Sequence, residues 1–233
     1  MNNRRQEIAA GLAAVRERIA AACARSGRET DEVRLIVVTK FFPASDVRLL
    51  ADLGVGDVAE NRHQEAEAKA AECADLGLSW HFVGGLQSNK AAAVARYADA
   101  VHSVDRTKLV APLDRGAHDR SHPLDVLVQV SLDPPGGSQR SGAEPEELDA
   151  LAAAVEEAGR LRLRGLMAVA PLGEDPAAAF GRLAEVRARF LETHPGAAWL
   201  SAGMSADLEA AIAAGATHVR IGSAVLGSRP EVK

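Results

Sequence analysis

The sequence predicts a (β/α)8 barrel, and three observations lead to this prediction. Short apolar runs alternate with helical stretches along the chain, eight such runs are present, and several helical stretches end at a glycine. Apolar runs without polar alternation suit strands that are buried on both faces of a parallel sheet. Eight strands match the closed barrel better than an open doubly wound sheet, which usually has about five to seven. Because no linker divides the 233 residues, we expect residues 1–233 to form a single domain.

The first expected element is an amphipathic helix over residues 3–25, which ends before Gly27. Its apolar positions recur at helical spacing: Ile8, Leu12, Val15, Ile19 and Ala22. The continuous run from Leu35 to Thr39 then predicts the first buried strand. The seven further strands are expected at residues 57–60, 80–83, 100–104, 125–131, 163–169, 199–202 and 218–221. Between them, four glycines have the position of helix C-terminal stops: Gly54, Gly77, Gly159 and Gly215.

Composition narrows the class of protein and its surroundings. The chain is 47% hydrophobic and 25% charged, as in soluble globular proteins. No window approaches the roughly 18 apolar residues of a membrane helix, and no signal segment follows the N-terminus, so we expect a cytoplasmic protein without membrane contact. A formal net charge of −5 and 3% aromatic residues argue against nucleic acid as a partner. Cys23 and Cys73 are expected to be reduced thiols, with no zinc-site spacing around them.

The segment most typical of a loop follows the fifth strand, within residues 133–142. It reads Asp133-Pro134-Pro135-Gly136-Gly137-Ser138. Loops after strands lie on the functional face of a barrel, so this segment is compatible with a mobile lid or with a plain surface loop.

Lys40 stands at the carboxyl end of the first strand, where the active groups of barrels gather. Desolvation at the rim of a buried strand favours the neutral amine, which can condense with an aldehyde. A lysine at such a place can also extend its amine to solvent or pair with a carboxylate. The residue alone leaves both interpretations open.

Two segments near the C-terminus predict a phosphate site. Ser201-Ala202-Gly203-Met204-Ser205 follows the seventh strand and is expected to open a helix over residues 206–214, and Gly222-Ser223 follows the eighth strand and opens a short last helix. Free backbone N–H groups at two such helix starts can converge on one anion, and barrels often hold a phosphate after strands seven and eight. Taken singly, Ser205 could be an N-cap and Gly222 a tight turn.

Three further polar residues are expected near the same mouth. Arg220 lies within the apolar eighth strand and must find a carboxylate or a ligand acceptor in the interior. Glu60 and Asn61 end the second strand and should face the mouth, although Glu60 could instead be the structural partner of a buried cation. Nucleotide-binding glycine loops, a G-x-S-x-G elbow and H-E-x-x-H metal spacing are missing from the sequence.

Several blocks of sequence resemble those of a known family. They are Val38-Thr39-Lys40, Glu60-Asn61, Trp80-His81-Phe82-Val83-Gly84 with Leu86-Gln87-Ser88-Asn89-Lys90, Arg164-Gly165-Leu166-Met167, Gly203-Met204-Ser205 and Val219-Arg220-Ile221-Gly222-Ser223. In this order, and over nearly the whole chain, they resemble the pyridoxal phosphate homeostasis proteins, whose fold is similar to the N-terminal barrel domain of alanine racemases. Val58-Ala59, Gly85 and Arg140 depart from the family pattern, which affects local geometry rather than Lys40.

The resemblance implies how pyridoxal 5′-phosphate (PLP) would be bound. It implies a Schiff base between the aldehyde of PLP and Lys40, phosphate contacts from Ser205 and from the backbone of Gly222-Ser223, and an Arg220 that faces the pyridine nitrogen. It also implies that four further residues line the pocket: Asn61, Ser201, Gly203 and Met204.

PLP whose pyridine nitrogen faces an arginine is expected to be a weak catalyst. PLP is the best electron sink when its ring nitrogen is protonated, and a guanidinium does not promote that protonation. The only tyrosine, Tyr97, is expected in a helix after the third strand, and the chain ends soon after the eighth, so the acid/base pair of a racemase is not expected. We therefore expect a monomeric, cytoplasmic protein that buffers PLP or delivers it to PLP-dependent apo-enzymes, without catalytic residues.

Two alternatives from other classes remain open on the sequence. One is a single-domain PLP-dependent amino-acid racemase or related lyase, which needs an acid/base pair that the motifs do not reveal. The other is a barrel enzyme that acts on a phosphorylated sugar or small acid, with Lys40 forming an imine to the substrate.

Overall fold

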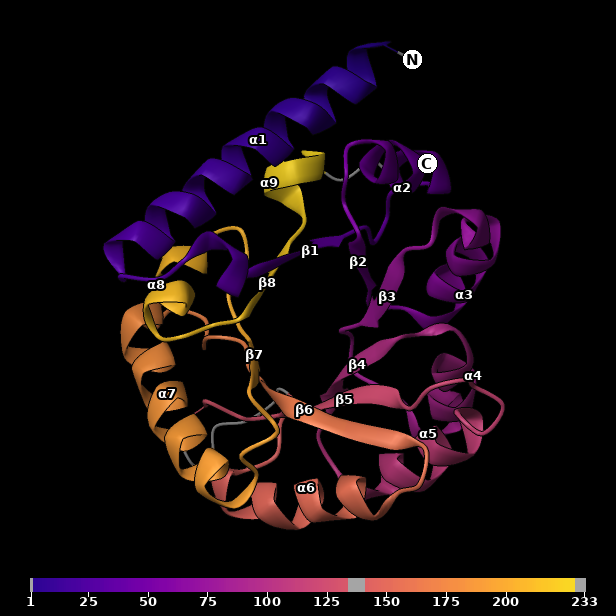
Figure 1. Cartoon of the computed structure of the whole chain (residues 1–233), viewed down its shortest axis with the longest axis vertical. Helices are drawn as coiled ribbons and strands as arrows, with labels where there is room; N and C mark the ends of the chain where they lie inside the picture. The colour runs from indigo at the N-terminus through magenta and orange to yellow at the C-terminus, as the bar shows by residue number, and fades with distance from the viewer. Residues whose placement is uncertain (1, 134–140, 229–233) are drawn as a thin grey trace.

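The computed structural model describes residues 2–133 and 141–228, and its eight strands close into a parallel barrel (Figure 1). Strands that are consecutive in sequence are neighbours in the barrel, and β1 pairs with β8 to close it. The strands are β1 Arg34–Val38, β2 Asp57–Glu60, β3 Ser79–Phe82, β4 Ala100–Val104, β5 Leu124–Gln129, β6 Leu161–Met167, β7 Trp199–Ser201 and β8 His218–Ile221. The predicted fold class is confirmed.

Helices surround the barrel, and α1 lies outside this ring against α8 and α9 (Figure 1). The α-helices are α1 Asn2–Arg25, α2 Ala44–Asp52, α3 His63–Glu72, α4 Ser88–Tyr97, α5 Val110–Gly116, α6 Leu148–Glu157, α7 Pro176–Thr193, α8 Leu208–Ala213 and α9 Ser223–Leu226. Four 3-10 turns complete the described elements: η1 Thr30–Glu32, η2 Ala74–Leu76, η3 Thr107–Leu109 and η4 Pro145–Glu147. No helix in the described ranges is long and apolar enough to cross a membrane.

The strand boundaries lie within one residue of the prediction except at β5 and β6. Both strands begin and end one or two residues earlier than expected. After β5 the N–H of Val130 still donates to the carbonyl oxygen of Met167, and the N–H of Ser131 donates instead to the carbonyl oxygen of Ala143. Gly165 lets β6 approach its neighbour closely, since a Cβ there would lie 1.9 Å from the carbonyl oxygen of Trp199. Residues 134–140 of the predicted loop lie outside the described residues.

The hydrophobic core lies between the barrel and its helices. One cluster joins β3 to β7 with α4 to α7, and a second joins β1, β2 and β8 with α1, α2, α8 and α9. Phe180, Leu183 and Leu200 are among the fully buried side chains of the first cluster. Gly11 permits the close packing of α1 on α9, because a Cβ there would lie 2.5 Å from the carbonyl oxygen of Val225. The leading helix therefore supports the last two strand-to-helix connections of the barrel.

Candidate functional site

A cavity of about 260 Å³ opens where β1, β7 and β8 end. Its walls come from three segments that follow these strands, and its lining residues are Val38, Lys40, Phe42, Met204, Ser205, Ala206, Arg220, Gly222, Ser223 and Gly227. Six of the nine predicted cofactor-binding residues line it: Lys40, Met204, Ser205, Arg220, Gly222 and Ser223. The closure of β8 onto β1 brings the segment after β1 together with the segments after β7 and β8 at this place.

A tight turn after β1 directs Lys40 to the cavity. Phe41, the residue after Lys40, has φ 71°, the only positive φ of a non-glycine residue in the described chain. Such a conformation costs about 1–3 kcal/mol and persists only where the surroundings impose it. Here the backbone N–H of Phe41 donates to Glu65 Oε1 at 2.6 Å, and the N–H of Phe42 donates to the carbonyl oxygen of Thr39 at 3.0 Å.

Lys69 of α3 stabilises the same turn through hydrogen bonds. Its ammonium group donates to Glu60 Oε1 and Glu65 Oε1 at 2.7 Å each, and to the carbonyl oxygen of Thr39 at 2.8 Å. Glu60 therefore points to α3 and does not face the mouth, so that expectation was wrong and its alternative as the partner of a buried cation is confirmed. Burial raises the pKa of Glu60, although hydrogen bonds from Lys69 and Thr39 oppose the shift.

Loss of the Lys69 ammonium should therefore destabilise the protein strongly. In Lys69→Met, the carboxylate of Glu60 stays buried without its counter-ion, and removal of one member of such a pair costs about 3–5 kcal/mol. Urea unfolding should show this loss at pH 7 and a smaller one at pH 5, because a protonated Glu60 needs no counter-ion. Lys108→Met, at an exposed lysine, is the matched control. Equal stability of the two variants would contradict the structural role of Lys69.

Two serine hydroxyls meet in this cavity, one from the segment after β7 and one from the segment after β8. Ser223 Oγ donates to Ser205 Oγ at 3.3 Å, and the N–H of Ala224 donates to the same oxygen at 3.4 Å. Ser205 does not open a helix as predicted, because α8 begins only at Leu208 and Asp207 Oδ1 accepts the N–H of Met204 in a preceding turn. Arg18 of α1 fixes this turn by donating to the carbonyl oxygen of Ser205 at 3.0 Å.

Arg220 of β8 lines the same cavity as Lys40 and the two serines. Its side chain is 4% exposed, and it donates to Ser201 Oγ at 2.6 Å and to the carbonyl oxygen of Ala168 at 3.0 Å. Burial lowers the pKa of Arg220 to about 10, while Asp207 acts in the opposite direction. The guanidinium is therefore still protonated at neutral pH and supplies one positive charge to the cavity.

Three predicted residues do not line this cavity. Ser201 is fully buried beneath Arg220. Gly203 lies behind the wall, where its carbonyl oxygen accepts the N–H of Arg220 and its φ of 92° requires glycine. Asn61 lines a separate cavity of about 200 Å³ that it shares with Gln87 and Lys90.

The prediction missed the histidines under Arg220. His102 of β4 bonds to Ser201 and to His81 of β3, and His81 bonds to Asp57 of β2. The sequence carried a signal for His81, a polar residue between Trp80 and Phe82, which pack on the helices. Such a residue must point into the barrel and find a partner there. The sequence carried none for His102, which lies between Val101 and Ser103.

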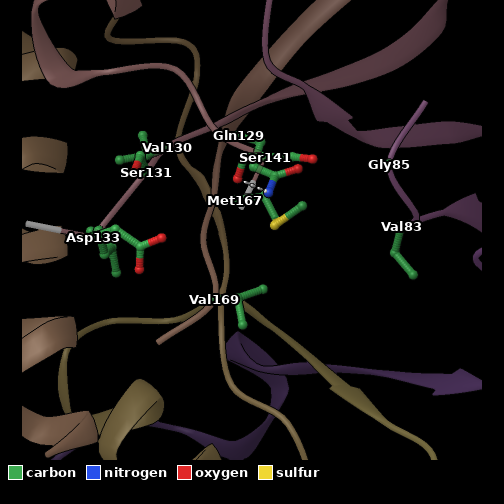
Figure 2. Close-up of a pocket in the computed structure, with 10 residues that line it drawn as sticks. Val83, Gly85, Gln129, Val130, Ser131, Asp133, Ser141, Met167 and Val169 are labelled. Carbon is green, nitrogen blue, oxygen red and sulfur yellow. Dashed lines mark hydrogen bonds between the residues drawn. The ribbon is translucent and has the colours of Figure 1, made fainter. Parts of the chain in front are cut away.

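A second cavity, of about 370 Å³, lies at the ends of β3, β5 and β6 (Figure 2). Figure 2 shows the side chains of Gln129 and Met167 in this space, with Gln129 Nε2 donating to the carbonyl oxygen of Ser141 at 2.6 Å. Asp133 is the one charged side chain among its described lining residues, and none is basic. The negative charge of Asp133 makes this second cavity unsuitable for an anionic ligand.

The chemistry of the first cavity suits a small phosphorylated aldehyde. Its described lining residues supply an amine, a guanidinium, two hydroxyls and the backbone of Gly222, and include no carboxylate. The amine can condense with an aldehyde, and the other groups are donors for phosphate oxygens or for a ring acceptor. PLP carries an aldehyde, a phosphate group and a pyridine nitrogen. The residues therefore fit the cofactor that the resemblance implies.

Comparison with known proteins agrees with this fit. The family model "Alanine racemase, N-terminal domain" matches residues 11–230. Proteins named pyridoxal phosphate homeostasis protein match over nearly their full length: that of Mycobacterium tuberculosis is 46% identical and that of Escherichia coli 42%, with 97% and 96% of this chain covered and 95% and 97% of theirs.

Solved structures extend the comparison. The structure of PipY from Synechococcus elongatus, which has PLP bound, is 35% identical with a TM-score of 0.81, and the match covers 94% of this chain and all of PipY. A protein from Bifidobacterium adolescentis has a TM-score of 0.87 at 32% identity, covering 97% of this chain and 96% of its own. The match to D-threonine aldolase from Filomicrobium marinum, at 20% identity, shows the fold alone. The chain therefore belongs to the family of the pyridoxal phosphate homeostasis proteins, with the fold of the alanine racemase N-terminal domain.

Proposed function

We propose that this protein holds PLP in the cavity between β1, β7 and β8, as a Schiff base on Lys40, and buffers or delivers the cofactor. The observation that carries the proposal is one cavity with an amine, a guanidinium, two hydroxyls and no carboxylate among its described lining residues. The names of the relatives and the PLP bound in the PipY structure support it.

Each residue of the cavity has a separate task in this proposal. Lys40 supplies the nucleophilic amine, and the turn at Phe41 with Glu65 fixes its direction. Ser205 and Ser223 donate to the phosphate, as does the backbone of Gly222, while Arg220 faces the pyridine nitrogen. Bound PLP would supply a covalently held aldehyde, and the positive charge of Arg220 would help to retain the anionic phosphate group.

Two features favour storage over catalysis. A guanidinium with a pKa of about 10 carries its own proton at neutral pH and does not help to protonate a ring nitrogen, which weakens the electron sink. Tyr97, the only tyrosine of the sequence, lies on α4 with a buried hydroxyl whose pKa is raised by burial and by nearby glutamates. It stacks on His63 and does not line the cavity of Lys40, so it is not placed to move a proton there.

The proposal includes the setting in which the protein acts. We infer a cytoplasmic protein, since both cysteines are buried free thiols, as is usual in reducing compartments. We also infer a monomer, because Leu172 and Met204 are the only large hydrophobic residues exposed in the described ranges, and light scattering tests this state. PLP-dependent apo-enzymes are the proposed recipients.

The function is tested by loading and transfer. PLP added to the purified protein should produce the visible absorbance of a bound Schiff base, and the loaded protein should reactivate an apo-aminotransferase. Incubation with alanine in deuterium oxide should give no more exchange at the α-carbon than free PLP gives. Faster exchange would favour the racemase alternative, and a protein that stays colourless would refute PLP binding.

A further inference from the structure

A continuous chain of hydrogen bonds runs through the inside of the barrel from Arg220 to Asp57. Arg220 Nη1 lies 2.6 Å from Ser201 Oγ, and the next three links, Ser201 to His102, His102 to His81 and His81 to Asp57, measure 2.9, 2.9 and 3.0 Å. Asp57 is the first residue of β2, whereas the cavity lies where the strands end. Because all strands are parallel, the chain of bonds connects the cavity wall with the opposite rim.

The protons of this chain can be arranged in one direction throughout. Arg220 only donates, so Ser201 accepts its N–H and is free to donate its own proton to His102 Nδ1. His102 is then protonated on Nε2 and donates to His81 Nδ1, which leaves His81 to donate from its own Nε2 to Asp57. Every member is satisfied, with two neutral imidazoles between one cation and one anion.

The opposite arrangement leaves a buried proton without a partner. If His81 carried a positive charge, it would donate to His102, and His102 would donate to Ser201. Ser201 would then accept from both His102 and Arg220, and its own proton would need another acceptor. In the described structure the hydroxyl of Ser201, which is fully buried, has only these two partners. The first arrangement is favoured because unpaired buried donors are costly.

The charges around the chain of bonds agree with neutral imidazoles. Burial lowers the pKa of His102 far below its usual range, and the charge of Arg220 lowers it further. Burial alone would raise the pKa of Asp57, but the hydrogen bond from His81 and the charge of Arg34 leave it lowered. Asp57 is therefore an ionised acceptor at neutral pH, and Arg220 is the ionised donor at the other end.

We propose that Ser201, His102, His81 and Asp57 are positioning residues that hold the Arg220 guanidinium in the cavity wall as an oriented donor. Each link fixes the tautomer or rotamer of the next, so the guanidinium need not reorganise when a ligand arrives, which favours affinity. The inference rests on the proposed function only in taking PLP as the ligand that Arg220 faces. The arrangement of protons is a property of the cofactor-free protein.

The first test is therefore made without cofactor. Nitrogen-15 NMR of the histidine rings at pH 7 should show His81 and His102 as neutral imidazoles, both protonated on Nε2. In Asp57→Asn the amide oxygen still accepts, so both tautomers should persist, whereas Asp57→Ala should shift the ring signals of His81 and His102. A doubly protonated His81, or a proton on Nδ1 of either ring, would overturn the proposal.

The second test measures the apparent dissociation constant of PLP by absorbance. Ser201→Ala removes the side-chain acceptor of Arg220, leaving only the carbonyl oxygen of Ala168, and should weaken binding by roughly tenfold and shift the absorption band. Ser103→Ala is the matched control, because Ser103 is an equally buried serine on β4 whose hydroxyl has no partner. Its affinity should stay within about twofold of the unmodified protein. Equal affinities of the two variants would refute the positioning role.

The two proposals fail in different ways. If borohydride reduction of the unmodified, PLP-treated protein leaves Lys40 unlabelled, the proposed function fails. The NMR measurement of the histidine tautomers still tests the proposed arrangement of protons, because it is made without PLP. If Lys40 is labelled but the tautomers differ from those expected, only the positioning role is lost. Should Ser201→Ala not fold, the tautomers of the unmodified protein and of Asp57→Asn provide the result.

Discussion

Borohydride reduction of the PLP-loaded protein should attach one cofactor to Lys40, and Lys40→Met should lose both this label and the visible absorbance. Lys40 is the only lysine among the described residues that line the cavity. The amine of Lys69 is engaged by two carboxylates and a carbonyl, and Lys90 lines a different cavity. An amine that is buried and ion-paired is a poor nucleophile, so the loss in Lys40→Met should be complete.

Peptide mass mapping after reduction identifies the labelled lysine. Lys108→Met serves as the control, since Lys108 is exposed on η3 and should make no difference to the labelling of Lys40. A label found on Lys69, Lys90 or Lys108 in the unmodified protein would contradict the assignment of Lys40.

Acidic residues at Ser205 and Ser223 should expel the cofactor. The two hydroxyl oxygens lie 3.3 Å apart at the proposed phosphate position, so Ser205→Asp/Ser223→Asp would place two carboxylates against a phosphate. Like charges about 4 Å apart repel by about 4 kcal/mol at an effective dielectric constant of about 20, which corresponds to several hundredfold in affinity. An absorbance titration should therefore show a loss of at least about a hundredfold.

The double alanine variant separates charge from lost hydrogen bonds. Ser205→Ala/Ser223→Ala should bind PLP more weakly than the unmodified protein but much more tightly than the acidic pair, because only neutral donors are lost. Ser121→Asp adds negative charge in the segment before β5, on the opposite rim, and should leave affinity nearly unchanged. Retained affinity in the acidic pair would show that the phosphate is held elsewhere.

Local patterns predicted most of the framework. The boundaries of β2, β4 and β8 agree with the expected residues, and the leading helix is Asn2–Arg25 against an expected 3–25. These elements are set by apolar runs and helical spacing, which depend on neighbours in sequence. The start of α8 was missed because the side chain of Asp207 closes a turn on Met204, and this competes with helix formation at Ser205.

The direction in which strand side chains point could not be predicted in the same way. A strand of a parallel barrel is buried on both faces, so its sequence need not alternate between polar and apolar residues. Glu60 shows the consequence, since it was expected at the mouth and points instead to Lys69. His102 shows the converse, because its neighbours Val101 and Ser103 do not alternate around it and its inward direction only became evident with its partners.

Three features can be read from the residues alone: eight apolar strands alternate with helices, a lysine follows the first strand, and serines and glycines follow the last two. Each of these is a local property of the chain. Which of these residues meet depends on the folded barrel, because closure of β8 on β1 places Arg220 and Ser223 beside Lys40. Closure also joins Asp57, His81, His102 and Ser201 from four strands into one hydrogen-bonded chain, and no spacing in the sequence encodes a contact across the barrel.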